Sequence, residues 1–373
     1  MISSDGSRWA RLSAMTDVIV FVPERPATGL LVADESPFVA PRTALFIDAA
    51  LGSRLGVHAQ ARIDRGFDPG RERGGDARVD EYFIDALLLE AGQTTLRAGK
   101  FATVFGAWVE RHLAWDNPLI TAPALYEDLV TITDRAAPAD FAVFNGRRDA
   151  PDNKQTWIPV IWGPSYATGA ALSAQFESVT MAIEVKNAAL SSRPESWSAA
   201  DHGVEAGPTV TGRLGWHPRT EWTLGFSASH GPYLRETARS TLPAARDLED
   251  YSQTTLAADL TYELHRLQLW AELVRSSFEV PRVGNLGTYG GFVEVRYKLA
   301  PQWWLAGRWN QSWFDDTPTL GQTWDRDLRR FDVAVGYRHD AHIQAKLEYS
   351  VGDQSGGDTN GNQHFAAQFV IWF

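Results

Sequence analysis

Apolar and polar residues alternate with a period of two along most of this chain, and helical periodicity is weak. In residues 179–186 every second side chain is apolar, and most of those between are polar or charged. The same period recurs in residues 331–338, 343–350 and 363–373. Because successive side chains of a strand point to opposite faces, the pattern predicts β-strands with one apolar and one polar face.

Sixteen segments of this kind can be counted, most of them close to the ~10 residues that a tilted strand needs to cross a bilayer. Turns of two to four residues alternate with long polar loops between these segments. We therefore predict an all-β fold, a sixteen-stranded antiparallel transmembrane β-barrel with short periplasmic turns and long extracellular loops. Residues 1–27 are predicted to be a periplasmic lead-in, and residues 28–373 the barrel. The predicted strands are 28–35, 42–51, 55–64, 78–90, 93–103, 166–176, 178–188, 207–217, 220–231, 250–263, 266–278, 287–299, 302–314, 327–339, 342–352 and 363–373.

A soluble β-sandwich or propeller would also show alternation and turns. Three features disfavour it. The apolar faces are rich in single small and aromatic residues, the polar faces carry charge in nearly every strand, and no repeat of ~40–50 residues recurs.

Aromatic residues recur at the short-turn ends of the predicted strands. Trp216 and Trp222 flank one turn, and Tyr262, Trp303 and Tyr337 adjoin others. Membrane barrels carry such rings as a girdle at the boundary between lipid and water. The alternative is ordinary core packing, but the recurrence at strand ends favours the girdle.

Two stretches resemble outer-membrane proteins of Gram-negative bacteria. The aromatic end of "QHFAAQFVIWF" (363–373) resembles the signal that the barrel-assembly machinery reads. "LRAGKFATVFGAW" (96–108) resembles the strand-and-loop entry of phosphate-selective-porin-like porins, in which Gly-Lys/Arg-Phe precedes Phe-Gly. Elsewhere the likeness is to the architecture of general sixteen-stranded porins. It implies a place in the cell outer membrane, contact with its lipid, and homotrimers, although no subunit face can be identified. No phosphate-binding arginine ladder can be matched, so anion selectivity does not carry over.

The connecting segment of residues 104–166 lacks the alternation of apolar and polar residues and is far longer than an ordinary loop. It follows the fifth predicted strand, where the loop of general porins folds into the barrel and narrows it. Its many apolar and aromatic residues need a surface to pack on, which the barrel interior offers; an extracellular cap or partner-binding surface is the alternative. The charged candidates for a constriction are Glu110, Arg111, Asp116, Glu127, Asp128, Arg135, Arg147 and Arg148.

If the apolar faces meet lipid, the polar faces line a hydrated lumen, where fixed charges bias the passage of ions. The inward basic and acidic residues are about equal in number, so ion pairs that stiffen the wall are as good an interpretation as ion selectivity. The predicted pore-lining residues are Arg62, Glu81, Asp85, Arg97, Glu184, Lys186, Arg213, Asp259, Glu272, Glu294, Arg296, Lys298, Arg308, Asp332, Arg338, Lys346 and Glu348.

The composition limits the chemistry open to these 373 residues, whose formal net charge is −11 at pH 7. Cysteine is absent, which excludes disulfides, a thiolate nucleophile and Cys-ligated metals. No stretch approaches the ~18 apolar residues of a transmembrane helix. Residues 1–15 lack the basic start and apolar core of an export signal, so we expect that any such signal has been removed.

Nothing in the sequence points to catalysis. The nucleophile-elbow, P-loop and dinucleotide motifs are absent, and the nine histidines are scattered. We therefore predict no enzyme activity, cofactor, metal site or nucleic-acid partner. The predicted function is passive diffusion of small hydrophilic solutes and ions. The alternative is a barrel that sheathes or anchors a partner, such as a multihaem cytochrome or a surface lipoprotein. A soluble β-rich binding protein is the third interpretation.

Overall fold

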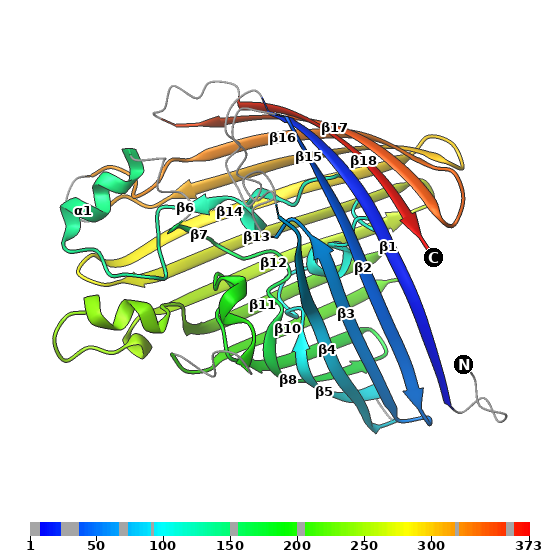
Figure 1. Cartoon of the computed structure of the whole chain (residues 1–373), viewed down its shortest axis with the longest axis horizontal. Coiled ribbons are helices and arrows are strands. Elements are labelled where there is room, and N and C mark those ends of the chain that lie inside the picture. The colour runs from blue at the N-terminus through cyan, green and yellow to red at the C-terminus, as the bar shows by residue number, and fades with distance from the viewer. Residues whose placement is uncertain are drawn as a thin grey trace.

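Sixteen antiparallel strands close into one barrel, in which each strand pairs with its neighbour in sequence and β1 pairs with β18 (Figure 1). The computed structural model describes residues 8–23, 37–66, 74–90, 93–149, 156–199, 206–317, 321–355 and 362–373. The barrel strands are β1 (Arg8–Pro23), β2 (Phe38–Leu51), β3 (Leu55–Asp64), β4 (Asp76–Leu89), β5 (Thr94–Phe101), β8 (Ala167–Phe176), β9 (Val179–Lys186), β10 (Thr209–Arg219), β11 (Trp222–Pro232), β12 (Ser252–Leu264), β13 (Leu267–Val280), β14 (Gly284–Lys298), β15 (Trp303–Phe314), β16 (Leu328–Arg338), β17 (Ile343–Gln354) and β18 (Asn362–Trp372).

The predicted sixteen-stranded barrel is confirmed, but the prediction for its first strand is wrong. β1 lies within residues 1–27, the predicted lead-in, and pairs with β2 and β18. The predicted strand 28–35 lies outside the described residues. Alternation is weak in β1 because Leu12 is the one large apolar residue on the outward face of its first half, and because residues 18–22 are apolar on both faces.

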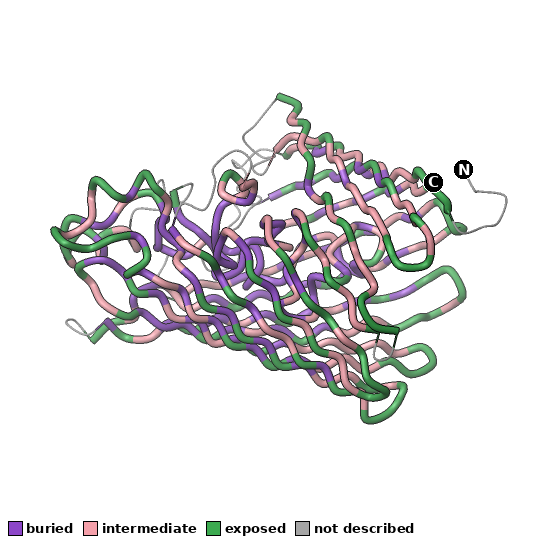
Figure 2. Tube along the Cα trace, turned by 90° about the horizontal axis from the view of Figure 1, so that it is seen from below, coloured by how far each residue is buried: buried purple, intermediate pink, exposed green. Residues whose placement is uncertain are grey.

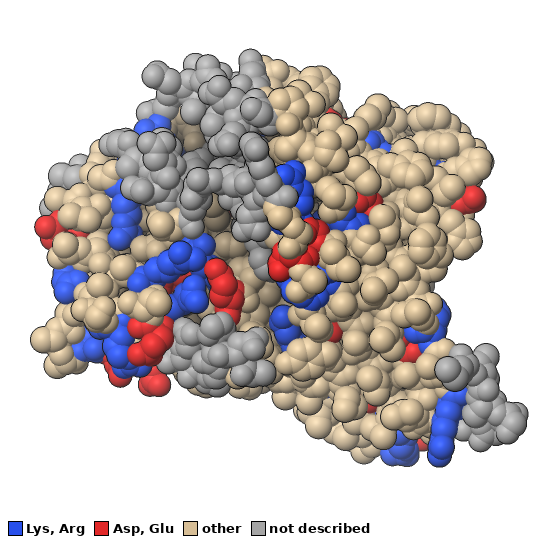
Figure 3. Space-filling model, viewed as in Figure 1, with Lys and Arg blue, Asp and Glu red and all other residues tan. Residues whose placement is uncertain are grey.

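The apolar faces of the strands form the exterior of the barrel. Ile183, Val333 and Leu347 are 51%, 38% and 60% exposed and do not pack against a second protein layer. Buried and exposed positions alternate along the strands in Figure 2. In Figure 3 the strand surfaces are largely free of charge, and charged side chains gather toward the ends of the barrel. Such an exterior suits hydrocarbon, with polar side chains inside.

The aromatic residues at the short-turn ends of β10 to β16 lie on the outer face, as a girdle requires. Trp216 is 49% exposed, and the ring of Trp222 lies beside that of Tyr262 with centroids 4.4 Å apart and a tilt of 45°. Trp303 and Tyr337 form a similar pair at 4.6 Å. Exposed rings of this kind do not belong to a protein core.

Helices are few and short. They are η2 (Val109–Arg111), η3 (Ala124–Tyr126), α1 (Phe141–Gly146), η4 (Arg147–Asp149), η6 (Pro194–Ser196), η7 (Glu236–Thr241) and η8 (Leu248–Asp250). Among the described residues, none of the helices is long and apolar enough to pass through a membrane.

Residues 102–166, here called the lumen segment, connect β5 to β8; much of the described part lies inside the barrel, and α1 lies at the long-loop end (Figure 1). The segment contains a small sheet of β6 (Leu129–Val130) and β7 (Ile158–Pro159). Its buried side chains, among them Phe105, Leu125 and Trp162, form one cluster with inward residues such as Val274 and Phe292. This part of the segment therefore packs on the inner wall, whereas α1 and η4 lie at the long-loop end (Figure 1), where Arg148 donates to the carbonyl oxygen of Thr323.

Two glycines explain the Gly-Lys-Phe and Phe-Gly elements at the start of the lumen segment. Gly99 has φ +141°, and a Cβ atom there would lie 2.1 Å from the carbonyl oxygen of Tyr82. Gly106 has φ +72°, and a Cβ atom would lie 2.3 Å from the hydroxyl of Tyr126. Only glycine fits both the backbone conformation and the close approach at these positions.

The orientation of the strands predicts a difference between two arginine substitutions. Leu273 is 57% exposed near the middle of β13, so Leu273→Arg would place a charge in lipid and lower the free energy of unfolding by about 2–4 kcal/mol. Thr261→Arg, on the inner face between Asp259 and Glu263, is the control and should change it by less than about 1 kcal/mol. Urea unfolding in lipid vesicles measures both values. Equal losses would contradict the assignment of inner and outer faces.

Candidate functional site

The lumen segment is fixed to the inner wall of β17 by two charged side chains. Lys346 donates hydrogen bonds from Nζ to three carbonyl oxygens of the segment, those of Ala114, Asn117 and Leu119, at 2.8–2.9 Å. Glu348 accepts hydrogen bonds from the backbone N–H groups of residues 120 and 121 and, at 2.6 Å, from the hydroxyl of Thr121. Both charges are buried and have their hydrogen bonds supplied by one stretch of chain.

A network of buried ion pairs on β14 to β16 continues this attachment. Arg308 is fully buried, lies 2.9 Å from Asp332 and 3.3 Å from Glu294, and donates to Thr121. From the lumen segment, Arg111 pairs with Glu294, and Glu127 lies 2.6 Å from Arg330. Breaking a buried pair leaves a charge without compensation and costs about 3–5 kcal/mol, so the network holds the segment in one place.

Other wall residues hold the beginning of the segment. Glu184 of β9 accepts from the hydroxyl of Thr103 at 2.6 Å, and Lys186 donates to the carbonyl oxygen of Phe101 at 2.7 Å. Glu272 of β13 accepts from the backbone N–H of Ala107 at 3.0 Å. Glu81 of β4 and Ser227 of β11 accept from the backbone N–H groups of Ala102 and Gly106, so the polar attachments come from β4, β9, β11 and β13 to β17.

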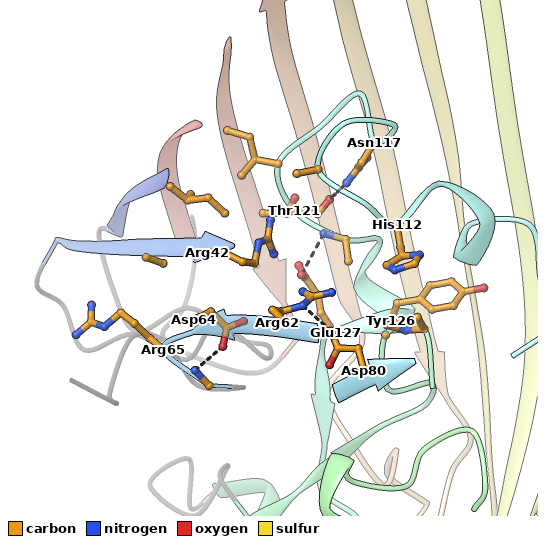
Figure 4. A pocket seen from close by; sticks show the side chains of 18 of the residues that line it. Arg42, Arg62, Asp64, Arg65, Asp80, His112, Asn117, Thr121, Tyr126 and Glu127 are labelled. Carbon is orange, nitrogen blue, oxygen red and sulfur yellow. Dashed lines mark hydrogen bonds and ion pairs between the residues drawn. The ribbon is translucent and has the colours of Figure 1, made fainter. Parts of the chain in front are cut away.

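The segment leaves a cavity of about 200 Å³ between itself and the inner wall of β1 to β4 (Figure 4). Four arginines of this wall line the cavity, and three of them pair with aspartates. Arg42 lies 2.9 Å from Asp17, Arg62 lies 2.5 Å from Asp80, and Arg78 lies 2.6 Å from Asp64. The fourth, Arg65, donates to the carbonyl oxygen of Val39 at 2.7 Å.

Aromatic side chains of the lumen segment line the opposite side of the cavity. The rings of Trp108 and Tyr126 lie 4.8 Å apart, and Nε2 of His112 lies 2.5 Å from the hydroxyl of Tyr166. Burial lowers the pKa of His112 to about 4 and raises the pKa values of Tyr126 and Tyr166, because a charged form would lose its hydration. This side of the cavity is therefore uncharged at neutral pH, apart from Glu127.

The predicted pore-lining residues fall into three groups in the structure. Arg62 lines the cavity. Ten bind the lumen segment or the networks that hold it: Glu81, Glu184, Lys186, Glu272, Glu294, Arg308, Asp332, Arg338, Lys346 and Glu348. The other six are Asp85, Arg97, Arg213, Asp259, Arg296 and Lys298.

Residues of this third group lie mainly in the half of the lumen near the short turns. Arg97 pairs with Asp85 at 2.8 Å, and Arg213 pairs with Asp259 at 2.5 Å. Lys298 is exposed where β14 ends. The side chain of Arg97 is 38% exposed and that of Arg11, on the inner face of β1, is 68% exposed. Solvent therefore reaches into this end of the lumen.

The eight charged candidates of the lumen segment are also spread out. Glu127 lines the cavity, Arg111 binds the wall, Glu110 and Asp116 are exposed, and Asp128 is buried. The remaining three lie away from the cavity. Arg135 lies 3.4 Å from Glu195, and the guanidinium groups of Arg147 and Arg148 donate to the carbonyl oxygens of Thr131 and Thr323.

The sequence pattern predicted only one of the four arginines that line the cavity, which are here called the arginine wall. No arginine ladder was expected, yet Arg42, Arg65 and Arg78 join Arg62 along one cavity. Opposite Gln60, β4 contains a β-bulge that breaks the alternation, so that Asp80 is buried on the inner side next to Glu81. Arg42 was the first residue of its predicted strand. The signal that could have found these residues is the density of Arg and Asp in "DARVD" (76–80), close to "ARIDR" (61–65).

Comparison by sequence identifies no relative of the chain. No protein-family model matches it, and no curated protein matches it.

Comparison by structure finds porins and outer-membrane channels. OmpF of Salmonella typhi, in complex with daunomycin, has a TM-score of 0.65 and 12% identity over 100% of this chain and 99% of its own. The anion-selective porin of Comamonas acidovorans has a TM-score of 0.60 and 9% identity, over 98% and 100%. The outer-membrane channel DcaP of Acinetobacter baumannii has a TM-score of 0.59 and 10% identity, over 100% and 99%. At these identities the likeness shows that the chain has the fold of bacterial outer-membrane porins.

The buried imidazole of His112 predicts a pH dependence of stability. Its pKa of about 4 is below the ordinary 6.5, so between pH 6.5 and pH 4 only the unfolded chain takes up this proton. The free energy of unfolding should therefore fall in this window by up to about 3 kcal/mol, at about 1.4 kcal/mol per pKa unit. His112→Gln should remove this part of the pH dependence. Urea unfolding in detergent micelles at pH 7 and pH 4 measures it.

His339→Gln is the control for this measurement, because His339 is exposed in a turn. The control should keep the pH dependence of the unchanged protein. An unaltered dependence in His112→Gln would contradict the role given to the buried imidazole.

Proposed function

We propose that this chain is a porin of the Gram-negative outer membrane, through which small hydrophilic solutes and ions diffuse passively. The observation that carries the proposal is the cavity of about 200 Å³ between the lumen segment and the arginine wall of β1 to β4. The solute route runs past this cavity and through the hydrated half of the lumen near the short turns. No step of this function requires a catalysed reaction.

Several observations support a membrane channel. The exterior is apolar and has an aromatic girdle, while the interior holds the charges, as in a barrel that spans lipid. Two proteins of the same fold are described as an anion-selective porin and an outer-membrane channel. Contact with outer-membrane lipid, insertion by the barrel-assembly machinery and assembly into a homotrimer are parts of the same proposal.

The fixed charges give the proposed route its electrical character. Three of the four arginines on the wall beside the cavity are paired with aspartates, so the fixed charges there are largely balanced. The narrowness of the cavity limits the size of the solute. Passage then depends on weak contacts that a solute makes and leaves again.

The sheath alternative fits the lumen less well. A sheath holds its partner in the barrel interior, but the lumen segment already fills much of that space and is attached by buried ion pairs. Placing a cytochrome there would require these pairs to break. The anchor form of this alternative, with a partner on the outside, stays open as an outcome of the experiment below.

The absence of cysteine allows a direct test of the route, because a single introduced thiol can be labelled. Ala40 is on the inner face of β2 and lines the cavity, whereas its neighbour Val39 is on the outer face and 49% exposed. We expect the unchanged protein to conduct KCl in a planar bilayer. A cationic methanethiosulfonate should lower the conductance of Ala40→Cys and leave that of Val39→Cys unchanged.

The channel proposal fails if the purified barrel does not conduct, and co-purification of a haem protein or lipoprotein would then favour the sheath or anchor. Conductance with equal effects of the reagent on both variants would place the route away from the cavity. Both variants keep a small side chain, so the barrel should fold in either case.

The attachment of the lumen segment predicts a second effect on conductance. Lys346→Met leaves three carbonyl oxygens of the segment without their donor and should lower the free energy of unfolding by about 3 kcal/mol or more. The loosened segment should give a larger and noisier single-channel current. Lys298→Met removes an exposed lysine at the rim and is the control. An unchanged current in Lys346→Met would show that the segment does not set the width of the route.

A further inference from the structure

A groove of about 330 Å³ lies on the outer, lipid-facing side of β11 to β15. Large apolar side chains such as Phe226 and Leu273 form its walls, and small residues such as Ala271 and Gly291 form its floor. At Gly291 a Cβ atom would lie 2.4 Å from the carbonyl oxygen of Glu272, so only glycine fits there. Because this face of the barrel meets hydrocarbon, an acyl chain is the natural occupant of the groove.

The groove ends in polar residues on the long-loop side. Gln311 and Trp313 of β15 both line it. From Trp303, in the aromatic girdle, to Trp313 the strand advances by ten residues. At ~3.3 Å per residue and a tilt of about 40° this corresponds to roughly 25 Å, the height of the apolar band of a membrane barrel. Trp313 therefore lies at the outer boundary of the hydrocarbon, and Gln311 lies just inside it.

An exposed arginine lies beside Gln311 on this outer face. Arg329 of β16 is opposite Gln311 in the strand register, and its two neighbours in sequence are buried. Its side chain is 65% exposed, and its ion pair with Asp353 of β17 measures 3.7 Å, which is longer than a hydrogen bond. A guanidinium group at the edge of hydrocarbon loses part of its hydration, so an anionic partner that replaces the water stabilises it.

The hydrogen-bond donors at this end of the groove outnumber the acceptors. The guanidinium group of Arg329 carries five N–H donors, and the indole of Trp313 is a donor only. Nε2 of Gln311 donates a long hydrogen bond, 3.3 Å, to the carbonyl oxygen of Ser312. Phosphate oxygens can accept from all three side chains, and guanidinium groups bind phosphate through pairs of charge-assisted hydrogen bonds.

A second arginine of the same outer surface is already neutralised. Arg275 of β13 donates two hydrogen bonds to Asp315, at 2.6 and 3.2 Å. Its guanidinium carbon lies 4.0 Å from the centre of the Tyr289 ring. Arg329, with its longer ion pair, is therefore the cation of this surface that can bind an added anion.

We propose that the groove and its polar end together bind one phosphate-bearing anionic lipid of the outer leaflet. The phosphate is bound by Arg329, Gln311 and Trp313, and one acyl chain lies in the groove. A lipid is the occupant because the site joins an anion-binding end to an apolar hollow within the membrane. The inference goes beyond the proposed function, since it requires the barrel to lie in a membrane but not to conduct.

Native mass spectrometry of the refolded full chain in detergent measures the bound lipid directly. Phosphatidic acid and diacylglycerol with equal acyl chains differ only in the phosphate. We expect the chain to retain about tenfold more phosphatidic acid than diacylglycerol, because of the paired hydrogen bonds to the guanidinium group. Equal retention of the two lipids overturns the inference. Complete displacement of phosphatidic acid by inorganic phosphate would show a site for the free anion and would also overturn it.

Two variants test the headgroup end. Arg329→Gln should lower the retention of phosphatidic acid about tenfold, whereas Asp353→Asn should raise it, because it removes a carboxylate that competes for the same arginine. Arg246→Gln is the matched control: Arg246 is also on the long-loop side, is 60% exposed and has a loose ion pair with Asp250 at 3.5 Å. Equal losses in Arg329→Gln and Arg246→Gln would show general charge attraction and would overturn the assignment.

A further variant tests the groove. Ala271→Leu fills its floor with a side chain that the lipid-facing surface tolerates, and should lower the retention of phosphatidic acid severalfold. Ala49→Leu, on the outer face of β2 away from the groove, should not. Unchanged retention in Ala271→Leu would overturn the placement of the acyl chain. Because the site is outside the barrel, Arg329→Gln should keep the conductance of the unchanged protein, so failure of this inference is distinguishable from failure of the channel.

Discussion

The shape of the lumen depends on a few buried charges that bind the backbone of the lumen segment. Lys346 and Glu348 between them take up carbonyl oxygens and N–H groups of residues 114–121, and Arg308 binds Thr121 beside two wall carboxylates. A charge removed from water is costly unless it is paired and hydrogen-bonded. Another position of the segment would leave these charges without partners. The network therefore selects one position, and with it the width and the lining of the remaining space.

This selection makes the two sides of the lumen different. The segment covers charges of β13 to β17, while the arginine wall of β1 to β4 still borders open space. The wall remains stable because aspartates separate its cations. The β-bulge in β4 is important here, since it places Asp80 between Arg62 and Arg78. Without that carboxylate the two guanidinium groups would repel each other, so a local irregularity of the strand allows a dense row of arginines to exist.

The alternation of apolar and polar residues along the chain was enough to predict the barrel. The residues of each strand decide locally which of its faces meets lipid. The alternation failed for β1, where residues 18–22 are apolar on both faces, and at the bulge, which shifts the phase of the pattern. The site was less predictable. Arg62 was found from its position in a strand, but the partners of Lys346 lie up to 232 positions away, and no local pattern contains such contacts.

The equal numbers of inward acidic and basic residues illustrate the same limit. Counted along the sequence, they suggest a lumen without preference for either sign. In the structure many of them neutralise each other out of contact with water, as Arg308 does with Asp332 and Glu294. A solute meets only the charges that the lumen segment leaves uncovered. Around the cavity Arg42, Arg62 and Arg78 are themselves paired with aspartates, and Arg65 donates to the carbonyl oxygen of Val39. The charge that a solute meets in such a barrel therefore follows from which ion pairs are buried and not from the total charge.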